Sequence, residues 1–110
     1  MDEQRVWVVT GANRGLGAEF VRQLLLDKTN YVFATICSLP EDVAGPIYTL
    51  HRRCLAHQDD RLQLIHLDTS DEASIKAAAA KIHKLKPDGI DYVINNADAT
   101  DAADAASSAL

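Results

Sequence analysis

Three glycines lie close together near the beginning of the chain, in the segment TGANRGLG at residues 10–17. A short apolar run at residues 5–9 precedes them, and apolar residues at three- and four-residue intervals follow them. A glycine loop between a strand and a helix is typical of dinucleotide sites, because free N–H groups and the helix dipole bind phosphate there. The segment therefore either binds a pyrophosphate or is simply a flexible turn.

Each glycine of this loop has its own reason to lack a side chain. Gly11 would let the chain turn sharply out of the strand, and Gly15 would let the backbone approach a pyrophosphate. Gly17 would let the following helix pack close to the sheet. This division of roles favours the phosphate-binding interpretation.

Strands and helices alternate along the chain. Apolar runs predict strands at residues 5–9, 31–36, 62–67 and 90–95, and helical periodicity predicts helices over about 15–28, from near Pro46, and up to Leu85. Thr69 and Glu72 have capping-box spacing and are expected to begin the third helix. The expected inward faces are Leu16, Phe20, Val21, Leu24 and Leu25; Ile47, Leu50, Cys54 and Leu55; and Ile75, Ala78 or Ala79, Ile82 and Leu85. This alternation predicts βαβ units and a parallel sheet.

The last part of the chain has a different composition. Alanine makes up half of residues 97–110, and no large apolar side chain occurs there before Leu110. Such a segment buries little surface and is expected to be a frayed helix or disordered. We therefore predict one domain at residues 1–97 and a tail at residues 98–110.

Charge and composition exclude several classes of function. The net charge of −5 and the lack of a basic run beyond Arg52 and Arg53 argue against nucleic acid or an anionic membrane as a partner. The polar start and the lack of a long apolar stretch predict a soluble, cytoplasmic protein in which Cys37 and Cys54 are reduced. His51, Cys54 and His57 recur every three residues without a fourth ligand, so we expect no metal site.

Three of these motifs together resemble the short-chain dehydrogenase/reductase family. They are the glycine loop at 10–17, Leu67 and Asp68 after the third strand, and Asn95, Asn96 and Ala97 after the fourth. The match covers about residues 5–97, and within it the stretches 71–76 and 91–97 resemble the C-factor-like carbonyl reductases. The resemblance implies an α/β, Rossmann-like parallel sheet of order 3-2-1-4 with helices on both faces and an NAD or NADP site.

The resemblance also assigns roles to individual residues. The residues implied to line the pyrophosphate and adenosine are Gly11, Asn13, Arg14, Gly15, Leu16 and Gly17. Asp68 would hydrogen-bond the adenine amine, or it is only a turn residue before Thr69. Asn95, Asn96 and Ala97 would pass beside the ribose, or the two asparagines only bond the fourth strand to its neighbour.

The residues after the second strand indicate which cofactor is bound. A chain that selects NAD usually has an acid there, and this chain has Ile36, Cys37 and Ser38 instead. Arg14 either contacts a 2′-phosphate, as the resemblance implies, or is a solvated loop arginine. Cys37 stands where similar carbonyl reductases have a second arginine. We therefore expect NADP, with NAD as the alternative.

Two departures from the family pattern concern binding and catalysis. Asp98 stands where the family has glycine, close to the expected path of the cofactor. No tyrosine is followed four residues later by lysine, because Thr35, Arg52 and Asn96 occupy those positions. We therefore expect a family member truncated after its fourth strand and without catalytic residues, whose exposed strand edge self-associates. The alternative is a dinucleotide-binding or interaction module without catalysis.

Overall fold

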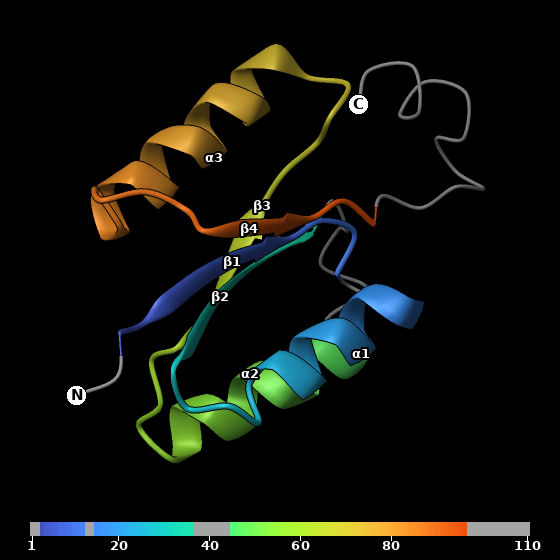
Figure 1. Ribbon diagram of the computed structural model, residues 1–110. Helices are drawn as coiled ribbons and strands as arrows, with labels where there is room; N and C mark the ends of the chain where they lie inside the picture. The colour runs from blue at the N-terminus through green and yellow to red at the C-terminus, as the bar shows by residue number, and fades with distance from the viewer. Residues whose placement is uncertain (1–2, 13–14, 37–44, 97–110) are drawn as a thin grey trace.

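A computed structural model describes residues 3–12, 15–36 and 45–96 of the chain (Figure 1). The elements are β1 (Arg5–Val9), α1 (Gly15–Leu24), β2 (Asn30–Ile36), α2 (Pro46–Ala56), β3 (Leu62–His66), α3 (Glu72–Leu85) and β4 (Tyr92–Ile94). The strands and helices alternate as the sequence predicts. The tail expected at residues 98–110 lies outside the described residues.

The four strands form one parallel sheet in the order β3-β2-β1-β4, which confirms the expected topology. Figure 1 shows α1 and α2 on one face of the sheet and α3 on the opposite face. The crossover from β3 to β4 runs in the opposite direction along the sheet to the crossovers before it. Right-handed crossovers therefore place α3 on the face opposite α1 and α2.

Two apolar clusters lie on the two faces of the sheet. Val9, Val21, Val32 and Ile47 are fully buried on the face covered by α1 and α2. On the α3 face the buried cluster consists of Val6, Val8, Tyr31, Phe33, Ile65 and Ala78. Every residue of β2 is buried, because strands flank it on both sides and helices cover both of its faces.

Helix α1 is shorter than expected and presents a different face to the sheet. It ends at Leu24 rather than near residue 28, because the Asp27 carboxylate accepts bonds from the Thr29 N–H and hydroxyl and forms a turn. Its buried residues are Gly17, Ala18 and Val21. The prediction of Leu16 and Phe20 as inward residues was wrong, since they are 68% and 37% exposed.

Helix α3 begins two residues later than the capping box predicts. Its N-cap is Asp71, which accepts a 3.0 Å hydrogen bond from the Ala73 N–H, so the prediction of Thr69 as N-cap was wrong. The Asp71 N–H donates to the Asp68 carbonyl, which closes a turn before the helix. Strands β3 and β4 are also shorter than predicted, at residues 62–66 and 92–94.

Helices α2 and α3 bury only part of their predicted apolar faces. Leu55 is 61% exposed, whereas Ile47 and Cys54 of α2 are buried as expected. In α3, Ala78 is the buried residue, and Ile75 and Leu85 are 43% and 40% exposed. No helix in the described ranges is long and apolar enough to span a membrane.

Candidate functional site

The carboxyl ends of β1, β3 and β4 lie at one edge of the sheet, because the strands are parallel. Backbone hydrogen bonds join the first residues of the loop after β1 to the ends of the neighbouring strands. The Thr10 N–H donates to the Ile94 carbonyl at 3.0 Å, and the Ala12 N–H donates to the Thr35 carbonyl at 2.9 Å. This edge therefore brings together the glycine loop and the segments that carry Asp68, Asn95 and Asn96.

The backbone of the glycine loop adopts conformations that favour glycine. Gly11 has φ +61° and Gly15 has φ +60°, both in the left-handed region. A Cβ built on Gly15 would have no heavy atom of the described residues within 4 Å, so among them space is open beside this residue. Gly15 is therefore required for its conformation and not because of crowding.

Gly17 is required because of crowding. A Cβ at this position would lie 2.3 Å from the Gly11 carbonyl oxygen, 2.9 Å from the Ala12 Cα and 2.8 Å from Asn96 Nδ2. The first turn of α1 thus packs directly against the backbone of the loop that precedes it. The sequence predicts a close approach of Gly17 to the sheet, and the structure shows that its nearest neighbours are the loop and Asn96.

Thr10 joins the glycine loop to the segment after β4. Its hydroxyl donates to Asn95 Oδ1 at 3.1 Å and accepts from the Asn96 N–H at 2.8 Å. The structural role considered for the asparagine side chains is therefore present for Asn95, whereas Asn96 bonds Thr10 through its backbone N–H. Sequence reasoning did not assign Thr10 to the site, although a polar residue that ends an apolar strand was a usable signal.

Asp68 forms the turn that follows β3. Its Oδ1 accepts hydrogen bonds from the Ser70 N–H at 3.0 Å and from the Ser70 hydroxyl at 2.6 Å. The hydroxyl bond is the largest cause of the lowered pKa of the Asp68 carboxyl, followed by the backbone bond. Asp68 is therefore ionised at neutral pH, and its turn role is compatible with an acceptor role toward a ligand.

Four predicted site residues, Asn13, Arg14, Cys37 and Ala97, lie outside the described residues, as does Asp98. Leu16 is placed in the first turn of α1 with an exposed side chain. In the part of the chain that the structure describes, no three histidine, cysteine or acidic side chains group as metal ligands. Cys54 is a buried thiol whose pKa is raised mainly by burial.

A hollow also opens at the amino ends of β1 and β4, opposite the glycine loop. It is lined by Glu3, Gln4, Arg5, Asp27, Thr29, Asp91 and Tyr92. Arg5 bonds Asp27 at 2.9 Å and Thr29 at 2.8 Å, and Asp91 accepts from the Val6 N–H. These bonds join β1 to its neighbouring segments. None of the predicted site residues that the structure describes lines this hollow, and the carboxyl end of the sheet remains the better candidate.

A parallel sheet of order 3-2-1-4 with a glycine loop at the end of its first strand defines a Rossmann-like α/β protein. The family model for short chain dehydrogenases matches residues 5–109. The chain belongs to this family, as the resemblance of its motifs implies.

Curated relatives agree with this assignment. The chain is 36% identical over 91 residues to the short-chain dehydrogenase/reductase atnB of an Arthrinium species, which covers 83% of this chain and 31% of the relative. It is 37% identical over 92 residues to human hydroxysteroid dehydrogenase-like protein 2, covering 83% of this chain and 22% of the relative. The chain thus spans less than a third of the length of these relatives.

Solved structures of reductases share the fold. An NADPH-bound carbonyl reductase from chicken fatty liver superposes with a TM-score of 0.67 at 39% identity, over 88% of this chain and 35% of the reductase. Menthone neomenthol reductase from Mentha piperita superposes with a TM-score of 0.71 at 29% identity, over 87% of this chain and 32% of the reductase. Carbonyl reductases are therefore among the structural relatives, as the sequence resemblance predicts.

Proposed function

We propose that the chain forms the NADP(H)-binding part of an oxidoreductase that transfers hydride between NADP and a carbonyl or alcohol substrate. The observation that carries this proposal is the packing of Gly17 against Gly11 and Asn96. It joins the first turn of α1, the glycine loop and the end of β4 into one unit at the carboxyl edge of the sheet. That edge is where open α/β sheets bind dinucleotides.

The residues at this edge fit a dinucleotide. Gly15 has open space beside it, so an anion can approach the N–H groups of the first turn of α1. The Asp68 carboxylate, ionised at neutral pH, would accept a hydrogen bond from the adenine amine. Asn96 and Ala97 would lie beside the adenosine ribose, and Arg14 would bind the 2′-phosphate.

The chain's own contribution to the reaction is binding and orientation. The dinucleotide supplies the hydride chemistry when it is bound. Reduction of a carbonyl also needs a positioned proton donor, and the tyrosine–lysine spacing of the family is absent from these 110 residues. The second candidate function is a module that binds a dinucleotide or another protein without catalysis.

Calorimetric titration of the chain with NADPH and NADH tests the proposal. We expect NADPH to bind more tightly, and Arg14→Ala to narrow the difference by roughly 1–2 kcal/mol through loss of a charge-assisted bond. Arg53→Ala, on an exposed position of α2, is the matched control and should leave the difference unchanged. Equal affinities would contradict the NADP assignment, and no binding of either dinucleotide would contradict the whole proposal.

Self-association through β4 is a separate proposal. In the described part of the chain β4 has one strand neighbour, β1, so its other edge is open. Tyr92 and Val93 are 49% and 60% exposed along it. An open edge flanked by exposed apolar side chains favours pairing with a second copy.

A further inference from the structure

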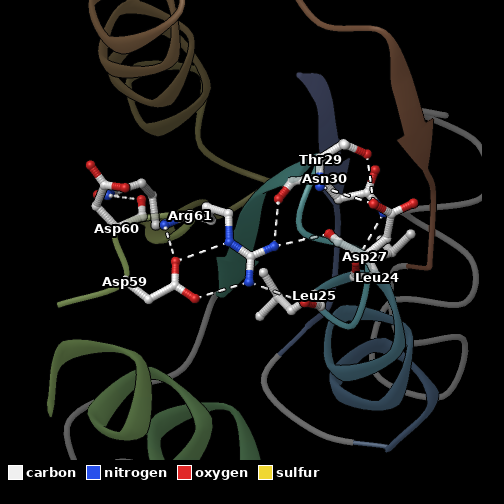
Figure 2. Close-up of polar contacts among 9 residues, drawn as sticks. Leu24, Leu25, Asp27, Thr29, Asn30, Asp59, Asp60 and Arg61 are labelled. Carbon is white, nitrogen blue, oxygen red and sulfur yellow. Dashed lines mark hydrogen bonds and ion pairs between the residues drawn. The ribbon is translucent and has the colours of Figure 1, made fainter. Parts of the chain in front are cut away.

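Arg61, the residue directly before β3, makes more polar contacts than the sequence suggests. Its guanidinium lies between Asp59 on one side and the segment from Leu25 to Asn30 on the other (Figure 2). Nε and one terminal nitrogen donate to the two Asp59 carboxylate oxygens at 3.0 and 2.9 Å. The side chain is 17% exposed, so these bonds form largely away from water.

Three backbone carbonyls complete the contacts of Arg61. Its terminal nitrogens donate to the carbonyls of Leu25 at 3.1 Å, Asp27 at 2.9 Å and Asn30 at 3.2 Å. The Leu25 carbonyl directly follows the last residue of α1, the Asp27 carbonyl lies in the turn after it, and the Asn30 carbonyl belongs to the first residue of β2. A cation at this end also interacts favourably with the helix dipole. Arg61 therefore binds the connection between α1 and β2, beginning at the residue directly after the helix, from a different part of the chain.

The other end of α1 is the candidate dinucleotide site. Ten residues of helix are about 15 Å long and behave as a rigid rod. At the amino end, Gly17 packs against the Gly11 carbonyl with no room for a Cβ. At the carboxyl end, Arg61 and the buried Asn30, whose Nδ2 donates to the Leu24 carbonyl at 2.9 Å, fix the position of the helix.

We propose that Arg61 is a positioning residue for the glycine loop, acting through α1 on dinucleotide affinity without touching the dinucleotide. This inference rests on the proposed function, in which the N–H groups at the start of α1 bind the pyrophosphate. A shift at the carboxyl end of a rigid helix moves those N–H groups. The close packing at Gly17 cannot absorb such a shift without displacing the loop.

The test uses the full chain with Arg61→Lys, and Arg61→Gln as a second variant. Lysine keeps the charge but cannot form the planar, multiply bonded contact of the guanidinium. Arg22→Lys is the matched control, because Arg22 lies in the same helix and its ion pair with Glu19 is exposed. Ile65→Val, which shortens a buried side chain on the α3 face, controls for a general loss of stability.

Two measurements are made at a temperature where every variant is folded. We expect the backbone amide resonances of Gly11, Gly15 and Gly17 to move in both Arg61 variants, while Gly89 stays fixed as an internal reference. We expect NADPH affinity to fall about two- to thirtyfold, the range found for residues that act on a site without contacting its ligand. Arg22→Lys and Ile65→Val should change neither readout.

The outcomes separate this inference from the proposed function. The inference would be overturned if the glycine amide resonances of a folded Arg61 variant coincide with those of the wild type. It would also be overturned if the wild type binds NADPH and the variant binds NADPH with the same affinity. A wild type that binds no dinucleotide would overturn the proposed function instead. In that case the amide resonances of the three glycines would be the one remaining measure of whether Arg61 positions the glycine loop.

Discussion

The side-chain nitrogen of Asn96 lies 2.8 Å from the point where a Cβ on Gly17 would stand. These residues are far apart in the sequence, and they meet because β4 lies beside β1 in the sheet. The Gly11 carbonyl oxygen is closer still, at 2.3 Å from the same point. A methyl group at position 17 would therefore displace both the glycine loop and the segment after β4.

We predict that Gly17→Ala lowers the free energy of unfolding by about 1–3 kcal/mol, as overpacking of a close contact does. Asn96→Ala in the same chain should not restore stability, because the Gly11 carbonyl belongs to the backbone and cannot rotate away. Gly15→Ala is the comparison, since it meets no neighbour and suffers only from its positive φ. Urea unfolding measures all three, and full rescue by Asn96→Ala would show that the loop backbone is not the limiting contact.

The order of the elements along the chain and a parallel sheet could be predicted from local patterns, whereas the strand order 3-2-1-4 was implied by the family resemblance. Each strand is a short apolar run, and the glycine, proline and asparagine positions between them separate the elements. The faces of the helices were predicted less well. Periodicity placed Leu16 and Phe20 on the inner face of α1, whereas the requirement that Gly17 contact Gly11 sets a different rotation of the helix.

The contacts that organise the candidate site could not be read from the sequence. The turn in which Asp68 bonds Ser70 precedes α3, whose N-cap is Asp71 and whose first residue is Glu72. The spacing of the residues alone does not show which of the two local turns forms. Arg61 directly precedes β3 and contacts the segment after α1 only through the tertiary fold. Its neighbours in the sequence give no signal for this, because the acceptors are backbone carbonyls more than thirty residues away.

We predict no measurable oxidation of NADPH by this chain when it is offered aldehydes, ketones or quinones. The physical reason is that no tyrosine in these 110 residues has a lysine four positions later to assist proton transfer. Absorbance of NADPH at saturating protein is the measurement. Oxidation that follows the protein through purification and falls in Gly15→Trp would contradict this prediction.

The Asp59 carboxyl makes the free energy of unfolding depend on pH. Its hydrogen bonds to the Arg61 side chain are the main cause of the lowered pKa of its carboxyl in the folded chain. A carboxyl whose pKa is lower in the folded than in the unfolded chain stabilises the fold at pH values above its unfolded pKa, which is about 3.9. That stability is lost as the pH falls through the folded pKa.

We therefore predict that wild type and Asp59→Asn differ in unfolding free energy at neutral pH and converge as the pH falls below about 4. Asp60→Asn, at the exposed neighbouring position, is the control and should run parallel to wild type over the same range of pH. The measurement is chemical unfolding at half-unit steps of pH. A constant difference between wild type and Asp59→Asn down to pH 2 would mean that the ion pair is not responsible.

The side chains of β4 have different neighbours on the two faces of the sheet. Tyr92 stacks on Trp7 with ring centroids 4.4 Å apart, and Ile94 packs against the cluster beneath α1 and α2. Val93 points to the other face, where α3 packs through Ala78 and the half-buried Ile82. Val93 is left 60% exposed beside an edge with no second strand neighbour in the described residues.

We predict that the chain associates with increasing concentration, and that Val93→Lys shifts it toward monomer, because a charged residue on an edge strand opposes pairing. Leu55→Lys is the matched control: Leu55 is 61% exposed, nearly the same as Val93, but lies on α2 away from the edge. Size-exclusion chromatography with light scattering over a tenfold or wider concentration range measures both. If Leu55→Lys weakens association as much as Val93→Lys does, the contact is a general apolar one and not strand pairing. A monomer at every concentration, with cooperative unfolding and no binding of a hydrophobic dye, would mean that another part of the chain covers the β4 edge.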